Sequence, residues 1–264
     1  MVQAANSVGG TVNKCLQPRG RCLYLPLLMP MLLHRFQLLG QQLQLLPTAC
    51  LYWQEQQMLV LADVHLGKAT HFRKAGIAVP PALALSGLHK LSEVIDYCKP
   101  ESVVVVGDLF HSHANAENDL FVQWRQQYAQ LPIHLVMGNH DVLPMQVYQQ
   151  SGITVHAHSL LVPPFELVHQ PPTQPQPNRY YLSGHVHPAV RLKGSARQKI
   201  TLPCFHFGAQ VATLPAFGSF TGLHVIRPHK HDAVFAIAQH PTVPQIMPLQ
   251  QWGHGFEGGE IVAV

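Results

Sequence analysis

A run of four valines, residues 103–106, constrains the fold of this chain more than any other segment. The run carries no charge and stops at Gly107, which predicts a strand buried on both faces, as in a sheet covered by helices. Asp108 follows directly and is therefore expected in the crevice at the carboxyl edge of the sheet, where α/β proteins usually bind ligands. A single aspartate at such a position is more often only a turn former or a helix cap.

Polar side chains follow three further apolar runs in the same way. The runs are VLADVH, HLVMGNHD and YYLSGHVH, and the polar residues at their ends are Asp63, His65, Asn139, His140, Asp141, His185 and His187. Carboxylate, amide and imidazole groups are the ligands that Mn, Fe and Zn ions take in proteins. Four strand ends carrying such groups predict a metal site.

Composition favours a folded protein and permits a polyanionic partner. Of the 264 residues, 47% are hydrophobic and 11% are charged, which argues against disorder over most of the length. The net charge of +4 and the pI near 8.8 are compatible with a phosphate chain as substrate. Basic residues follow the first and the last motif, either as contacts to such a chain or as solvated loops: Lys68, Arg73, Lys74, Arg191, Lys193, Arg197 and Lys199.

The N-terminal segment 1–30 differs from the remainder and is expected to be a poorly ordered extension. Its apolar run of 12 residues is too short to cross a bilayer, and a small-residue cleavage site of a signal peptide does not follow it. No membrane association is therefore expected. We expect the natural start at Met29 or Met31 and one domain over 31–264. Five cysteines without a CxxC pair indicate a reducing cytoplasm.

The order of the elements predicts an α/β fold. Alternating residues 36–46 and the apolar segments 49–53 and 56–63 are expected as strands entering the core, followed by a loop with a short helix. A helix follows in which Leu88, Leu91 and Ile95 share one face and Pro100 ends the helix, so that a βαβ crossover leads into the valine strand. A further helix is expected over 121–130. Beyond Gly152 the segments are short strands: ITVHAHSL (153–160), PFELVHQ, RYYLSGH, VRLKG, QKITLPCFHFG, GLHVIR and DAVFAIAQ. A βαβ half followed by a β-rich half predicts two packed sheets with helices outside.

The motifs together resemble the calcineurin-like metallophosphoesterase superfamily. They are DxH at 63–65, GDxxH at 107–111, GNHD at 138–141, His169 after ELV, and GHxH at 184–187. The resemblance covers about residues 36–225 and implies a four-layer α/β/β/α sandwich of two mixed sheets flanked by helices. It also implies hydrolysis of phosphoesters at two divalent cations, which polarise the phosphoryl oxygens and acidify a water.

Phrases that extend beyond the metal motifs are similar to those of the bacterial ligase-associated DNA damage response endonucleases. They are LADVHLGKATHFRKAGIAVP, VVGDLFHS, SGHVHP, LPCF and LPAFGSFTG. This similarity implies single-stranded DNA as substrate, a role in DNA repair, and a functional association with an ATP-dependent DNA ligase and a helicase. His206 departs from the pattern because a larger aromatic residue is expected at this position.

The resemblance assigns a role to each site residue. Asp108 is expected to bridge two metals, one completed by Asp63, His65 and His187 and the other by Asn139, His169 and His185. His156 and His158 compete with His169 for its assignment. His140 would face the leaving oxygen with Asp141 orienting its ring, and His111 would lie behind the metal ligands. Mn²⁺ is the expected metal, with Fe or Zn²⁺ as alternatives.

The substrate contacts are less constrained by the motifs. Lys68, Phe72 and Arg73 could hold a phosphate and stack a base, although Phe72 fits the core equally well. The loop LPAFGSFTG either borders the substrate or only turns the chain. The leading function is a Mn²⁺-dependent phosphodiesterase that cleaves DNA. The alternatives are a nucleotide phosphodiesterase or phosphatase and a scaffold without activity, and the scaffold is disfavoured because every motif residue is present.

Overall fold

The computed structural model describes residues 32–68, 76, 85–111, 116–193, 198–219, 221–238, 244–249 and 261–262. The expected N-terminal extension lies outside this part of the chain, as do Phe72 and Arg73. Within it, no helix is long and apolar enough to cross a membrane.

The first sheet has seven strands in the order of the sequence, and its second half is parallel. β1 to β4 form an antiparallel meander, whereas β4, β5, β6 and β7 run parallel to one another. The strands are β1 (His34–Leu38), β2 (Gln41–Leu46), β3 (Cys50–Trp53), β4 (Met58–Ala62), β5 (Ser102–Val106), β6 (Ile133–Val136) and β7 (Ile153–His156). The valine run is β5, paired on both sides, as expected.

The second sheet contains the C-terminal strands and is also mixed. Its main path runs β14-β11-β12-β13-β10-β9-β8, with β15 paired to β12, β16 to β15, and β17 to β11. Its strands are β8 (Ser159–Val162), β9 (Phe165–Val168), β10 (Tyr180–Ser183), β11 (Pro188–Lys193), β12 (Lys199–Phe207), β13 (Val211–Thr213), β14 (His224–Val225), β15 (Ala233–Ala238), β16 (Gln245–Leu249) and β17 (Ile261–Val262). β9, β10 and β13 are parallel.

Alternate residues of the first sheet face two different cores. Val104 and Val106 face the second sheet and pack with its residues, among them Phe165, while Trp53 meets the Phe165 ring at 4.8 Å. Val103 and Val105 face the helices. The two sheets therefore pack face to face, which confirms the predicted sandwich of two mixed sheets.

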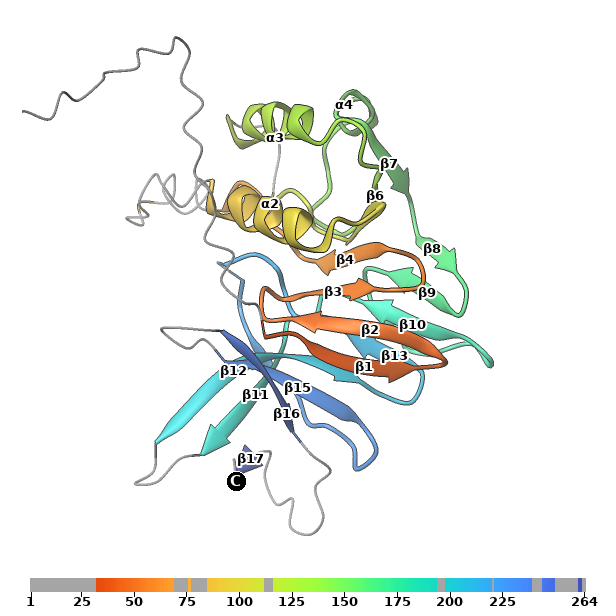
Figure 1. Ribbon diagram of the computed structural model, residues 1–264, viewed down its shortest axis with the longest axis vertical. Helices are drawn as coiled ribbons and strands as arrows, with labels where there is room; N and C mark the ends of the chain where they lie inside the picture. The colour runs from red at the N-terminus through yellow and green to blue at the C-terminus, as the bar shows by residue number, and fades with distance from the viewer. Residues whose placement is uncertain are drawn as a thin grey trace, which may run out of the picture.

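The described helices all pack on the outer face of the seven-stranded sheet (Figure 1). They are α2 (Ser86–Cys98), α3 (Ala116–Gln127) and α4 (Met145–Gln150). Leu88, Leu91 and Ile95 of α2 are buried, as their spacing predicts, and the helix ends at Lys99 in a left-handed conformation. α3 begins at Ala116, five residues before the helix expected from Phe121.

Two segments are divided differently from the expectation. The alternating segment 36–46 reverses at Leu39 and Gly40, which both have positive φ, 49° and 78°, as in a type I′ hairpin turn. Segment 153–160, expected as one strand, contributes β7 to the first sheet and β8 to the second. The bend at residues 157–158 thus links the parallel half of the first sheet to the second sheet.

Candidate metal centre

The candidate ligands meet because five parallel strands end at the same edge. Asp63 follows β4, Asp108 follows β5 and Asn139 lies beyond β6, while His169 follows β9 and His185 lies beyond β10. The two sheets are linked here by a hydrogen bond of 2.9 Å from the backbone N–H of His185 to Asp63 Oδ2. The convergence expected from the sequence is therefore present in the fold.

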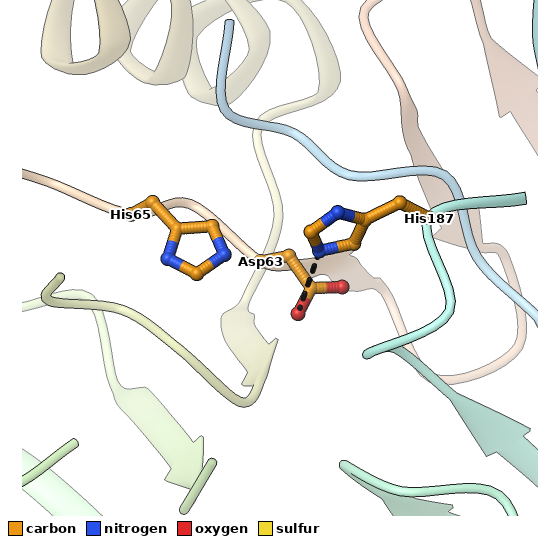
Figure 2. Close-up of side chains that lie close together, drawn as sticks. All are labelled: Asp63, His65 and His187. Carbon is orange, nitrogen blue, oxygen red and sulfur yellow. Dashed lines mark ion pairs between the residues drawn. The ribbon is translucent and has the colours of Figure 1, made fainter. Parts of the chain in front are cut away.

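Asp63 lies between two imidazole rings of the second sheet. Its Oδ1 is 3.6 Å from His187 Nε2 and 3.8 Å from His169 Nδ1. His65 completes a group with Asp63 and His187 whose ligand atoms all lie within 4.8 Å of one another (Figure 2). This is the first ligand set expected from the sequence, without its bridging carboxylate.

Asp108 faces both halves of the site through a single oxygen. Its Oδ2 is 3.7 Å from His65 Nε2 and 3.7 Å from His169 Nε2. Asp63, Asp108 and His169 form a second group with ligand atoms within 4.8 Å. An oxygen placed between the two ligand sets has the position that a bridging carboxylate requires.

Asn139 and His185 extend this second group. His169 Nε2 lies 3.0 Å from Asn139 Oδ1 and 3.1 Å from His185 Nδ1, so three donors of the expected second set are adjacent. His156, which competed with His169 for this assignment, instead contacts His134 at 3.2 Å. His169 is therefore the histidine that lies with the other predicted ligands.

Two buried polar atoms without a hydrogen-bond partner among the described residues indicate that the site is suited to a cation. Asp63 Oδ1 and His65 Nε2 are buried and accept or donate no hydrogen bond within the described part of the chain. A buried polar atom left unpaired costs about 1–3 kcal/mol, which a bound cation would offset. Burial lowers the pKa of His65 to about 2, with Lys68 contributing, so the imidazole is neutral, the form that binds metals. Oxygen and nitrogen donors without thiolate suit Mn²⁺, Fe or Zn²⁺.

Five of the predicted ligands have left-handed backbone conformations. Their φ angles are positive, a region that residues other than glycine rarely adopt. They are Asp63 (53°), His65 (50°), Asp108 (51°), His185 (68°) and His187 (50°). Each such residue costs on the order of 1 kcal/mol or more and persists only where the surrounding structure holds it. The clustering of these conformations at the ligands is typical of a functional site.

Three motif glycines leave space for the ligands. A Cβ on Gly107 would lie 1.9 Å from His169 Nδ1, and one on Gly138 would lie 2.1 Å from Asp108 Oδ1. A Cβ on Gly184 would lie 2.7 Å from the carbonyl oxygen of Val106. The glycines of the GD, GNHD and GHxH motifs are therefore needed because other chain segments approach their backbone closely.

Asp141 contacts backbone and not the His140 ring. Its Oδ2 accepts hydrogen bonds from the N–H groups of Asp108 at 2.8 Å and Gly138 at 2.9 Å, and its Oδ1 accepts one from Phe110 at 3.2 Å. Burial raises the pKa of this carboxyl to about 7, while the N–H donors oppose the shift. The expectation that Asp141 orients His140 is thus corrected: both oxygens are used by the turn after β5 and the loop after β6.

His140 and His111 lie together beside His65, and both are half-buried. Their rings stack with centroids 5.0 Å apart, and His140 meets the edge of His65 at 5.3 Å. The backbone N–H of His140 donates to Asp108 Oδ1 at 2.9 Å. His111 Nδ1 lies 3.4 Å from His65 Nδ1, behind the expected ligands.

Lys68 is the described member of the predicted substrate-binding residues. It is partly buried, and burial lowers the pKa of its ammonium, whereas Asp108 and Asp63 act in the opposite direction. The Lys68 ammonium is therefore close enough to Asp63 and Asp108 to interact electrostatically with both carboxylates.

The loop LPAFGSFTG supports the first ligand motif, a role that the sequence left open. The N–H of Phe217 donates to the carbonyl of Ala62 at 2.8 Å, and the N–H of Gly218 donates to that of Asp63 at 3.0 Å. Lys90 Nζ in turn donates to the Phe217 carbonyl at 2.8 Å and lies 4.1 Å from the centre of its ring. Nothing in the sequence links Lys90 to this loop, because the two segments are 127 residues apart.

The same loop holds the ring of His187. The carbonyl oxygen of Gly222 lies 3.2 Å from His187 Nδ1, which assigns the proton to Nδ1. His187 Nε2, which faces Asp63, is then the unprotonated nitrogen and is available as a ligand.

Comparison with known proteins agrees with this geometry. The model of the calcineurin-like phosphoesterase family matches residues 57–208. The chain is similar to the crystal structure of Pseudomonas putida nuclease MPE, with 30% sequence identity and a TM-score of 0.66, over 77% of this chain and 96% of that one. No curated protein matches the sequence.

Proposed function

Since the chain belongs to the calcineurin-like phosphoesterase family and is a metal-dependent hydrolase, we propose that it cleaves phosphodiester bonds of DNA at two Mn²⁺ ions. The observation that carries the two-metal proposal is the position of Asp108 Oδ2, 3.7 Å from a ring nitrogen of each ligand set. One carboxylate oxygen between two sets of donors is the arrangement that holds two cations close together.

The metal ligands follow from the distances in the site. Asp63, His65 and His187 would hold one ion and Asn139, His169 and His185 the other, with Asp108 shared. Two cations held there would offset the charge of the phosphodiester and would lower the pKa of a water so that hydroxide is available near neutral pH. The neutral imidazole of His65 and the tautomer of His187 prepare both rings for binding.

His140 is the candidate proton donor to the leaving oxygen. Its ring stacks on His111 and contacts the edge of His65, so it lies beside the expected ligands. The hydrogen bond from its backbone to Asp108 fixes its position relative to the bridging carboxylate. Asp141 acts on this step through the backbone, because it anchors the turn that carries Asp108.

Several features support DNA as the substrate. The similar protein from Pseudomonas putida is described as a nuclease, and the net charge of +4 favours a polyanion. The phrases that resemble the ligase-associated endonucleases support single-stranded DNA, a role in cytoplasmic DNA repair, and a functional association with an ATP-dependent DNA ligase and a helicase.

Hydrolysis of a 5′-labelled single-stranded DNA and of bis-p-nitrophenyl phosphate tests the proposal. Both substrates should be cleaved with Mn²⁺ and not with EDTA. Asp108→Ala should abolish both activities, since it removes the shared ligand. Asp96→Ala is the control, because Asp96 is exposed on α2 and its carboxylate accepts a hydrogen bond from Tyr128, away from the candidate ligands.

Each outcome distinguishes between the candidate functions. Cleavage of the small diester alone would leave the two-metal chemistry in place and exclude DNA in favour of nucleotides. Absence of both activities with Mn²⁺, Fe²⁺ and Zn²⁺ would favour a scaffold without activity.

A further inference from the structure

We propose that Lys90 is a positioning residue: it fixes a loop that holds the backbone of Asp63 and the ring of His187 for the binding of one metal. The inference rests on the two-metal function proposed above and adds a residue that acts through another segment. We call this segment the supporting loop and define it as residues 214–219, 221 and 222.

The supporting loop joins the two sheets at the strands that carry ligands. Its first residue, Leu214, donates a backbone hydrogen bond of 2.7 Å to the carbonyl of Ser183, the last residue of β10. Further along, the loop donates to the carbonyls of Ala62 and Asp63 at 2.8 and 3.0 Å. The loop therefore crosses from the end of β10 to the end of β4, and its position bears on the point where Asp63 leaves the sheet.

The loop is packed tightly against the first ligand motif. A Cβ on Gly218 would lie 2.5 Å from the carbonyl oxygen of Val64 and 3.1 Å from that of Asp63. The buried ring of Phe217 packs in the same core as Val64 and Leu66, which flank the ligand His65. Because the loop touches the motif through both backbone and side chain, a displacement of the loop would displace the motif.

The far end of the supporting loop holds a second ligand. Thr221 Oγ1 donates to the carbonyl of Gly218 at 3.2 Å, and the carbonyl oxygen of the next residue, Gly222, lies 3.2 Å from His187 Nδ1. The loop thus bears on two residues of the first ligand set, Asp63 through its backbone and His187 through its ring.

Lys90 fixes this loop to the helix α2. Its Nζ donates to the Phe217 carbonyl at 2.8 Å and lies 4.1 Å from the centre of the Phe217 ring, so one cation holds both the backbone and the side chain of that residue. Burial lowers the pKa of Lys90 to about 8, and the ammonium is therefore still charged at pH 7. Methionine, of similar length, would fill this position without the cost of burying a charge. The contacts with Phe217 therefore explain the lysine better than packing does.

Binding of Mn²⁺ at pH 7, followed by electron paramagnetic resonance of the free ion, tests this inference. The test variant is Lys90→Met, which keeps the length of the side chain and removes its charge and its hydrogen-bond donor. Lys90→Arg keeps both. Lys99→Met is the matched control, because Lys99 is exposed at the end of the same helix. His187→Ala identifies the affinity that belongs to the first ligand set.

We expect two Mn²⁺ affinities in the wild type and a selective effect of Lys90→Met. This variant should weaken about tenfold the affinity that His187→Ala removes, because residues that orient metal ligands typically contribute about 10–100-fold to metal affinity. It should leave the other affinity within about twofold of the wild type, which also shows that the variant is folded. Lys90→Arg should lose less than about threefold, and Lys99→Met should match the wild type.

Hydrolysis of bis-p-nitrophenyl phosphate gives a second readout. In Lys90→Met the Mn²⁺ concentration for half-maximal activity should rise by the same factor, whereas kcat at saturating Mn²⁺ should stay close to that of the wild type. Excess metal restores a site whose ligands are only poorly held, but it would not restore a site that has lost a catalytic group.

Gly218→Ala tests whether Lys90 acts through the supporting loop. The new Cβ would push the loop away from the Val64 carbonyl at the other end of the same path. If both substitutions act through this loop, the double variant should bind the first Mn²⁺ about as tightly as the weaker single variant. Fully additive losses would mean that Lys90 acts by another route and would overturn the inference.

The remaining outcomes separate this inference from the proposed function. If the wild type binds two Mn²⁺ ions and Lys90→Met binds both as tightly, loses both equally, or loses no more than Lys90→Arg, Lys90 does not position the first ligand set and the two-metal function stands. If the wild type binds one Mn²⁺ or none, the two-metal function fails and the inference fails with it.

Discussion

Replacement of Gly138 by alanine should disable the metal centre without unfolding the protein. The new Cβ would lie 2.1 Å from Asp108 Oδ1 and 2.5 Å from the backbone nitrogen of Asp108, against at least 3.4 Å for ordinary contact. The carboxylate would have to move by about 1.3 Å. It has little freedom to do so, because Oδ1 accepts the His140 N–H and the backbone nitrogen donates to Asp141.

The magnitude follows from this displacement. A shift of about 1 Å in a catalytic group lowers activity on the order of 10²-fold, and overpacking of this kind costs typically 1–3 kcal/mol of stability. Hydrolysis of bis-p-nitrophenyl phosphate measures the loss of activity, and urea denaturation measures the loss of stability. Calorimetric titration with Mn²⁺ measures the loss of metal affinity.

Gly87→Ala is the matched control for this substitution. Among the described residues its Cβ would meet Leu66 Cδ2 at 3.5 Å, an ordinary contact, and in the helix α2 alanine is favoured over glycine by about 1 kcal/mol. The control should therefore keep full activity and gain stability. If Gly138→Ala retained activity and Mn²⁺ affinity within threefold of the wild type, the tight contact with Asp108 would not be what the site depends on.

Three further perturbations test the electrostatics of the fold. Burial lowers the pKa of Lys90 from 10.5 to about 8, so the unfolded chain binds more protons than the folded protein between these values. The unfolding free energy of the wild type, measured relative to Lys90→Met by urea denaturation, should therefore rise by up to about 3 kcal/mol between pH 8 and 10.5. An equal difference between the two proteins at both pH values would contradict this. Mn²⁺ at 100 times its Kd should stabilise the protein by about 2.7 kcal/mol in urea denaturation, an increment that Asp63→Asn should largely remove. Asp141→Asn should cost about 2 kcal/mol, because its amide NH₂ would face the N–H donors of Asp108 and Gly138; a loss below 0.5 kcal/mol in the same assay would refute it.

The meeting of the ligands could be predicted because it follows from strand direction alone. Parallel strands bring their carboxyl ends to one edge of the sheet. Asp63, Asp108 and Asn139 each follow an apolar run, so each can be assigned to that edge from the sequence. The fold class followed from the same pattern together with the β-rich C-terminal half. His169 needed the structure, because His156 also follows an apolar run and only the strand order separates them.

Contacts between distant segments could not be predicted from local patterns. Lys90 lies on an amphipathic helix whose apolar spacing says nothing of a bond to Phe217 in a loop far along the chain. Asp141 was expected beside the ring of its neighbour, yet tight turns after β5 and β6 direct three N–H groups towards it. The short strand β13 was missed because three residues carry no readable alternation.

The left-handed conformations of the ligands have a consequence for how this protein can be changed. Glycine adopts such angles without steric penalty, so exchange of His65 or His187 for glycine would relieve backbone strain while it removes a donor. A selection for heat resistance alone would therefore tend to erode the metal centre, since improved variants are easiest to find where function is lost. Residues other than glycine at these angles are therefore explained by activity and not by stability.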